Sequence, residues 1–145
     1  MKKLVFALLG IFMAGAVMAQ SEPVKWNFSS KKISDKVYEI HLTATLDNGW
    51  HIYSQTQPKD AISQPTKIAF TSNPLTNLEG SVKEVGKMEK FHDAALGASA
   101  NQYSKTVKFV QKVTLKAAAG TVEYQPCDDS KCLPPKKMPF KVNVG

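Results

Sequence analysis

Hydrophobic and polar residues alternate with a period of two along most of this chain, and this alternation restricts the possible fold more than any other feature. Val24, Trp26 and Phe28 occupy alternate positions, with polar residues between them. The same alternation recurs in residues 38–44, 50–53, 68–70, 107–115, 122–124 and 138–144. Successive side chains of a β-strand point to opposite faces of its sheet. The pattern therefore predicts strands that bury one face each.

Turn residues separate these segments, as in Asp47-Asn48-Gly49 and Asn73-Pro74. A succession of about seven to nine short strands bounded by such turns is typical of an immunoglobulin-like sandwich. We therefore expect an all-β fold, namely an immunoglobulin-like antiparallel β-sandwich formed by a single domain. Residues 88–104 depart from the pattern, because they are rich in small residues. We expect them to form a long loop, and loops of that length are usually functional or mobile.

The N-terminus has the features of an export signal. Lys2 and Lys3 precede an apolar run from Leu4 to Val17, and Val17 and Ala19 occupy the two positions that a signal peptidase recognises. The run is shorter than the roughly 20 apolar residues that a membrane span needs. We therefore expect residues 1–19 to be a cleaved signal peptide. The mature domain, residues 20–145, would then enter an oxidising compartment, most simply the bacterial periplasm, without membrane insertion.

The charge of the chain argues against a nucleic-acid-binding protein. The formal net charge is +7, and loss of Lys2 and Lys3 lowers it to +5. All 19 basic residues are lysines, and they are scattered along the predicted strands. A nucleic-acid site would require a basic patch with arginine or interleaved aromatic residues. We interpret the lysines as a solvated surface.

Cys127 and Cys132 are the only cysteines, and only four residues separate them. They lie in a predicted loop between Tyr124 and Met138, too close in sequence to join opposite sheets. A disulfide closing so small a ring contributes only about 2 kcal/mol to stability in the chain-entropy model. Pro126, together with the double proline that follows Cys132, restricts the backbone of this loop. Spacing alone leaves three interpretations open, with a structural disulfide the commonest in exported proteins, followed by a redox pair and a metal site.

The histidines give little support to a metal site. His41, His51 and His92 lie at no short ligand spacing from the cysteines, and two thiols in an oxidising compartment would tend to form a disulfide. We expect surface or hydrogen-bonded imidazoles, and neither a metal nor a cofactor.

Two blocks of sequence carry a resemblance to a known family. "NGWHIYSQ" at 48–55 and "VEYQPCDDSKCLPP" at 122–135 resemble the N-terminal, immunoglobulin-like domain of the thiol:disulfide interchange protein DsbD. The similarity extends over residues 24–144. In that family the domain receives electrons from a thioredoxin-like donor and passes them to periplasmic thioredoxin-fold acceptors. The resemblance therefore implies a component of a protein-disulfide reductase, and it favours the redox pair over the structural disulfide.

The resemblance also implies roles for individual residues. Cys127 and Cys132 match the redox pair, and Cys132 matches the cysteine that forms mixed disulfides with partners. Tyr53 and His51 match strand residues beside the pair, and we expect both on an outward face. Phe91 matches the aromatic residue of a cap that covers the disulfide.

Some features depart from the family pattern. The spacer between the cysteines is short, Pro126 replaces a familiar glycine, and the sequence ends at Gly145 without a membrane or thioredoxin-like part. We therefore expect the electron donor on another chain. Asp128 and Asp129 disfavour a thiolate and outnumber Lys131, so we expect weakly acidified thiols. The alternatives are a non-enzymatic binding module with a structural disulfide and a metal-binding domain that uses His51 or His92.

Overall fold

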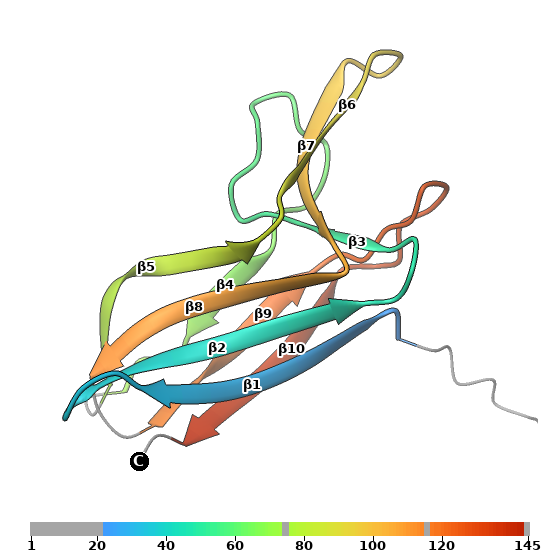
Figure 1. Ribbon diagram of the computed structural model, residues 1–145. Helices are drawn as coiled ribbons and strands as arrows, with labels where there is room; N and C mark the ends of the chain where they lie inside the picture. The colour runs from blue at the N-terminus through green and yellow to red at the C-terminus, as the bar shows by residue number, and fades with distance from the viewer. Residues whose placement is uncertain (1–21, 74–75, 115–116, 144–145) are drawn as a thin grey trace, which may run out of the picture.

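The computed structural model describes residues 22–73, 76–114 and 117–143. The expected signal peptide, residues 1–19, lies outside this part. All the named elements are strands (Figure 1). They are β1 (Val24–Lys32), β2 (Val37–Leu46), β3 (His51–Tyr53), β4 (Lys67–Phe70), β5 (Asn77–Gly86), β6 (Glu89–Asp93), β7 (Ala98–Ser104), β8 (Thr106–Thr114), β9 (Ala117–Tyr124) and β10 (Lys136–Asn143). Within the described ranges, no helix has the length and apolar character of a membrane span.

Two antiparallel sheets form a sandwich with one hydrophobic core. One sheet has the strand order β1-β2-β8-β5 and the other has the order β10-β9-β4. Trp26 of β1 joins the layers, because its ring lies 6.0 Å from that of Phe109 in its own sheet and 5.3 Å from that of Tyr124 in the opposite sheet. The predicted all-β, immunoglobulin-like antiparallel β-sandwich is confirmed.

The alternating hydrophobic residues supply this core as predicted. In β2, Ile40, Leu42, Ala44 and Leu46 are all buried. In β8 the buried row is Val107, Phe109, Gln111 and Val113, so a polar residue interrupts it. The predicted positions Leu115 and Val144 lie outside the described residues.

Gln111 is the polar exception in the core-facing row, and the strand beside it explains its burial. Its side-chain amide donates hydrogen bonds to the carbonyl oxygens of Glu79 and Gly80 at 3.0 and 3.2 Å. These carbonyls belong to β5, whose register shifts between Glu79 and Lys83. Gln111 thus satisfies carbonyls at an irregularity of the edge strand. The sequence pattern missed β5 because most of its residues are exposed, so it has no clear period of two.

The prediction of a long loop at 88–104 was wrong, because most of this segment forms an antiparallel hairpin. β6 and β7 pair from Glu89–Gln102 to Asp93–Ala98, and β7 also pairs with β3. A carboxylate oxygen of Asp93 closes the turn by accepting hydrogen bonds from the amides of Ala95 and Leu96. The small residues that suggested a loop include Ala98 and Ala100, which alternate on the buried face of β7.

A bend separates this hairpin from the sandwich, although β7 continues almost directly into β8. Lys105 lies between the two strands with a φ of 63°, a left-handed conformation. Opposite the bend, a Cβ on Gly86 would lie only 3.2 Å from the carbonyl oxygen of Thr106, so a side chain there would crowd the turn. The third sheet, β3-β7-β6, therefore projects from one end of the sandwich (Figure 1).

Candidate active site

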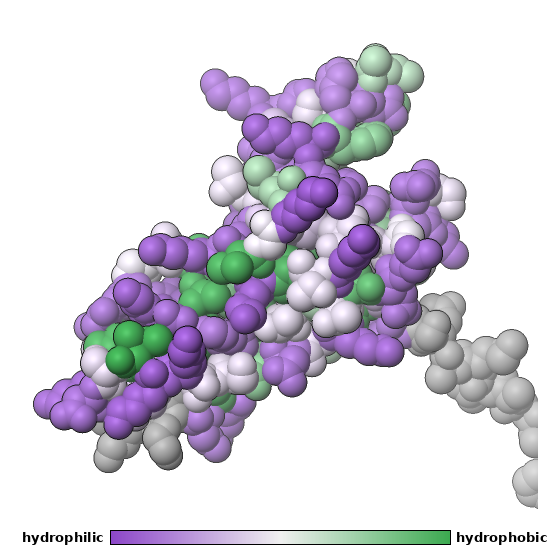
Figure 2. Space-filling view, in the orientation of Figure 1, coloured by the Kyte–Doolittle hydropathy of each residue, from purple (hydrophilic) through white to green (hydrophobic). Residues whose placement is uncertain are grey.

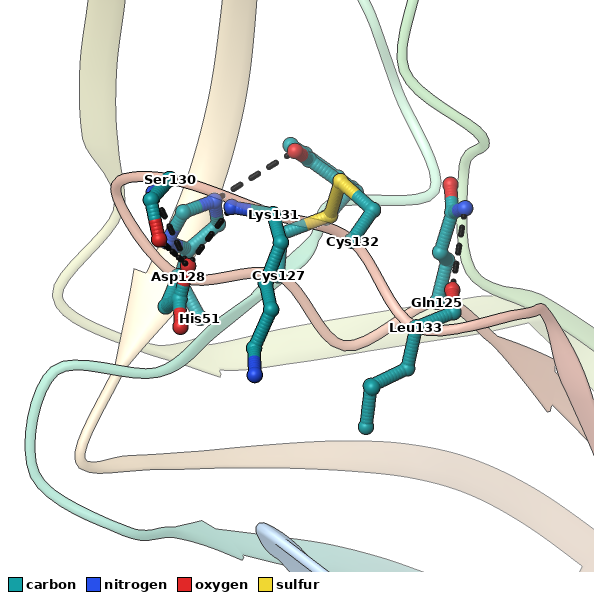
Figure 3. Close-up of a disulfide and its surroundings, with 9 residues drawn as sticks. His51, Gln125, Cys127, Asp128, Ser130, Lys131, Cys132 and Leu133 are labelled. Carbon is teal, nitrogen blue, oxygen red and sulfur yellow. Dashed lines mark hydrogen bonds between the residues drawn. A yellow bond between two sulfur atoms is a disulfide. The ribbon is translucent and has the colours of Figure 1, made fainter.

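The two cysteines form a disulfide across a short hairpin between β9 and β10 (Figure 3). This is the loop in which the sequence analysis placed them. The sulfur atoms are 2.04 Å apart and the Cα atoms 4.0 Å apart. On one side of the pair, the amide of Leu133 donates to the carbonyl oxygen of Pro126 at 2.9 Å. On the other side, the amide of Asp128 donates to the carbonyl oxygen of Lys131 at 2.8 Å. Cys127 and Cys132 are therefore direct cross-strand neighbours.

The hairpin is attached to β3 through Cys127. The amide of His51 donates to the carbonyl oxygen of Cys127 at 2.9 Å, and the amide of Cys127 donates to the carbonyl oxygen of His51 at 3.0 Å. Side chains of directly paired residues lie on the same face of a sheet. This pairing places the disulfide on the face of the third sheet that carries His51 and Tyr53. Cys127 packs there in a small buried cluster with Tyr53 and Ala100.

The two cysteines differ strongly in exposure. Cys127 is only 1% exposed, whereas Cys132 lies on the exposed side of the hairpin. The cause is the attachment just described, because Cys127 lies between β3 and Cys132, and Cys132 has no further strand beside it within the described residues. Cys132 is therefore the more accessible of the two cysteines to an attacking thiol.

His51 and Tyr53 share the face that points away from the sandwich core, as predicted, but this face is covered rather than exposed to solvent. They lie opposite Ile52, which is in the sandwich core, yet they are only 9% and 8% exposed. The disulfide hairpin and β7 flank them on either side. Their rings meet edge to face at 5.4 Å, with 3.3 Å between His51 Nε2 and the Tyr53 hydroxyl.

Burial governs the ionisation of both side chains. It lowers the pKa of His51, although the negative charges of Asp129, Glu89 and Asp128 partly oppose this effect. Burial also raises the pKa of Tyr53. Near pH 7 a neutral imidazole and a neutral phenol therefore lie beside the disulfide.

Phe91 stands at the rim of a cleft on the same face. It pairs with Ala100 across the β6–β7 hairpin, and its side chain is 53% exposed. The cleft has a volume of about 360 Å³, and its lining also includes His51, Tyr53 and Asp128. The structure thus brings the sequence-predicted Phe91, His51 and Tyr53 to one cleft beside the disulfide hairpin.

The turn of the hairpin is held by Asp128. One carboxylate oxygen accepts hydrogen bonds from the amide of Ser130 at 2.8 Å, the hydroxyl of Ser130 at 3.0 Å and the amide of Lys131 at 2.7 Å (Figure 3). The two amide hydrogen bonds are the main reason that the pKa of Asp128 is lowered. Lys131 extends over Trp50, with its Nζ 6.0 Å from the ring centroid. At this distance the ring attracts the ammonium group by a cation–π interaction.

A partly buried carboxylate that the sequence analysis missed fixes the projecting sheet on the sandwich. Glu84 of β5 accepts hydrogen bonds from the hydroxyl of Tyr103 at 2.6 Å, the hydroxyl of Ser54 at 2.8 Å and the amide of Gln55 at 2.7 Å. Burial and this carboxylate together raise the pKa of Tyr103 far above its usual value. Glu84 had no sequence signal, because a single glutamate in an exposed strand looks like an ordinary surface residue.

The remaining histidines lie apart from the cysteines in hydrogen-bonded positions. His41 contacts a carboxylate oxygen of Glu39 at 2.8 Å, and His92 contacts the hydroxyl of Ser99 at 2.8 Å. Among the residues that the structure describes, no three His, Cys, Asp or Glu side chains gather in a group that could hold a metal ion.

The chain is similar to known proteins in sequence and in fold. Residues 17–143 match the family described as "Thiol:disulfide interchange protein DsbD, N-terminal". Among solved structures, the N-terminal periplasmic domain of ScsB from Proteus mirabilis is 16% identical with a TM-score of 0.52, and the match covers 83% of this chain and 44% of that chain. The chain thus spans less than half of that ScsB chain. This likeness shows a shared fold.

A second solved structure is the Neisseria meningitidis DsbD N-terminal domain in its reduced form. It is 13% identical with a TM-score of 0.47, and the match covers 81% of this chain and 84% of that chain. No curated protein matches the sequence. The family match, however, includes every strand described above and both cysteines. The chain therefore belongs to the family of DsbD N-terminal domains.

Proposed function

We propose that this protein is an exported thiol–disulfide exchange domain that relays electrons through Cys127 and Cys132. The donor would be a thioredoxin-like protein, and the acceptors would be periplasmic thioredoxin-fold proteins. Family membership supports the chemistry. The observation that carries the proposal is the asymmetric pair, with Cys127 buried against Tyr53 and Ala100 and Cys132 exposed. A periplasmic location is supported by the N-terminal signal pattern and by the periplasmic ScsB domain of the same fold.

The proposed reaction is an exchange between sulfur atoms and needs no cofactor. A donor thiolate attacks the sulfur of Cys132, the bond between Cys132 and Cys127 breaks, and the Cys127 thiolate leaves and takes up a proton. The second donor thiolate then attacks the donor sulfur of the mixed disulfide and releases Cys132. The donor dithiol is oxidised, and the pair gains two electrons and two protons. The same steps in reverse reduce an oxidised acceptor.

The buried environment supports Cys127 as the internal cysteine. His51 Nε2 lies near the Tyr53 hydroxyl, and both side chains share the face of Cys127. A neutral imidazole and the nearby Asp128 and Asp129 carboxylates give a Cys127 thiolate little electrostatic stabilisation. A thiolate there would be short-lived, which favours rapid protonation or return of the disulfide.

The surroundings of the cleft support a protein partner. Ile62, Leu96 and Phe91 are 75%, 68% and 53% exposed, and all three line the cleft beside the disulfide hairpin. Figure 2 shows apolar atoms at the tip of the projecting sheet, in addition to apolar patches over the sandwich. Exposed apolar side chains gathered around one site are typical of docking surfaces. We propose that a thioredoxin-fold partner covers these side chains when its cysteine reaches Cys132.

Trapping of mixed disulfides tests the roles of the cysteines. Cys127→Ser leaves the exposed Cys132 without its partner. When the Cys132 thiol is first activated as a mixed disulfide with thionitrobenzoate, a thioredoxin whose second active-site cysteine is serine should displace thionitrobenzoate and form a stable mixed disulfide with Cys132. Cys132→Ser should trap far less, because Cys127 is buried. The measurement is the yield of the covalent complex on a non-reducing gel. Equal yields from both variants would contradict the assigned roles.

A second experiment tests Phe91 as the cap. Phe91→Ala should speed reduction of the disulfide by a small thiol such as dithiothreitol more than reduction by thioredoxin. The reason is that a docking protein would displace the ring, whereas a small thiol would not. His92→Ala is a matched control, because His92 is the next residue of β6 and faces the opposite side. If Phe91→Ala changes neither rate, Phe91 does not cap the disulfide.

A further inference from the structure

The two cysteines are positioned by different parts of the molecule. Cys127 is fixed by two backbone hydrogen bonds to His51 and by its burial. Cys132 is exposed, and the flanking hydrogen bonds of its own hairpin hold it opposite Cys127. Once the disulfide is broken, only these non-covalent contacts keep the two thiols side by side. The position of Cys132 in the dithiol state therefore depends on the turn.

Asp128 is the residue on which this turn depends. Its carboxylate oxygen accepts the three hydrogen bonds from Ser130 and Lys131, and its amide donates the bond to the Lys131 carbonyl oxygen. An aspartate that accepts backbone amides one turn ahead holds a turn closed without help from the rest of the protein. The neighbouring Asp129 carries the same charge but makes no such side-chain hydrogen bond in the described structure, so it provides a natural control.

We propose that Asp128 is a positioning residue that holds Cys132 beside Cys127 in the reduced protein and thereby sets the equilibrium between dithiol and disulfide. Disulfide formation requires the closed hairpin. Any loss of turn hydrogen bonds lets the reduced hairpin open, while the oxidised hairpin is kept closed by its covalent bond. Removal of the Asp128 side chain therefore favours the dithiol. The inference rests on the proposed function only because the dithiol and the disulfide must interconvert.

The experiment is equilibration of the domain with glutathione. Two glutathione thiols reduce the Cys127–Cys132 disulfide to the dithiol and become glutathione disulfide, so two electrons and two protons pass to the protein. Asp128→Ala should shift the equilibrium constant about tenfold toward the dithiol, which for a two-electron couple is about 30 mV. Asp128→Asn keeps an acceptor oxygen and should stay within about twofold of wild type, as should Asp129→Asn. Asp128→Ser, a weaker turn former, should fall between Asn and Ala.

A second measurement separates positioning from charge. In the reduced protein, hydrogen exchange at the Lys131 amide should be protected in wild type and in Asp129→Asn, and it should lose this protection in Asp128→Ala. An equilibrium constant for Asp128→Ala within about twofold of wild type would overturn the proposal. So would an equal shift in Asp128→Asn and Asp128→Ala, because charge alone would then explain it. The reduction midpoint of the wild-type disulfide tests the proposed relay. The ratio of the equilibrium constants of the variants tests the role of Asp128, so one proposal can fail without the other.

Discussion

The sandwich and the projecting redox end are stabilised in different ways. The sandwich is held by side chains such as Ile40 and Phe109, which are fully buried between two sheets. The redox end, formed by β3, β6, β7 and the disulfide hairpin, is held by hydrogen bonds at Glu84, His51 and Asp128, and it leaves Phe91 and other apolar side chains exposed. Most of the folding free energy should therefore come from the sandwich, so that the redox end can change its bonds without unfolding the domain.

A pair of phenylalanines, one in each region, should show this difference most clearly. Phe109→Ala removes a fully buried ring and should lower the free energy of unfolding by about 3–5 kcal/mol. Phe91→Ala removes a ring that is 53% exposed, and its effect should be within about 0.5 kcal/mol. Urea unfolding of both variants measures this. Similar losses from both would show that the redox end contributes to the core stability.

Glu84 should matter next, because it joins the two regions. Glu84→Ala leaves the buried Tyr103 hydroxyl and the amide of Gln55 without their acceptor, and it should lower the free energy of unfolding by about 1–3 kcal/mol. Hydrogen exchange should rise in β7 more than in β2. Glu79→Ala removes a carboxylate from the exposed part of the same strand and should change little. Equal effects of the two substitutions would argue against Glu84 as the joint between the regions.

Loss of the disulfide should be tolerated by the sandwich. Cys127→Ser combined with Cys132→Ser should cost no more than about 2 kcal/mol, the chain-entropy value for so small a ring. Circular dichroism and urea unfolding, compared with the oxidised wild type, measure this cost. A double variant that fails to fold would identify the disulfide as a structural requirement and contradict the redox interpretation.

The smallest expected effect concerns pH. Burial holds the pKa of His51 below its ordinary value of 6.5, so the unfolded chain binds a proton at a higher pH than the folded domain does. Stability should therefore decrease as the pH falls through about 6.5, and this slope should be weaker in His51→Gln. Urea midpoints between pH 7.5 and about 5 measure it, above the range in which most carboxylates titrate. An unchanged slope in His51→Gln would show that other groups cause the dependence.

The sequence predicted the sandwich better than the redox end for a physical reason. A strand such as β2 buries every second side chain in one core, and this leaves a period of two in the sequence. The position of the cysteine loop and the shared face of His51 and Tyr53 followed from the same pattern. The burial of these two side chains did not, because it depends on pairing with Cys127 and Ser104, which are distant in sequence.

The β6–β7 hairpin and the Glu84 contacts were missed for related reasons. In β7 the inward positions are occupied by Ala98 and Ala100, which are too small to mark a strand. Glu84 is held by residues from β7 and from the segment after β3, and no local spacing in the sequence connects them. Sites built from polar contacts between distant segments leave little trace in a single sequence.

The reduction potential of the Cys127–Cys132 disulfide distinguishes an electron relay from a structural disulfide. The oxidised domain, residues 20–145, would be equilibrated with glutathione or thioredoxin buffers, and the fractions of dithiol and disulfide would be measured after thiol alkylation. A redox pair in an exposed hairpin should have a midpoint well above −300 mV, the region of resistant structural disulfides. A midpoint at or below −300 mV would contradict the relay and identify the disulfide as structural.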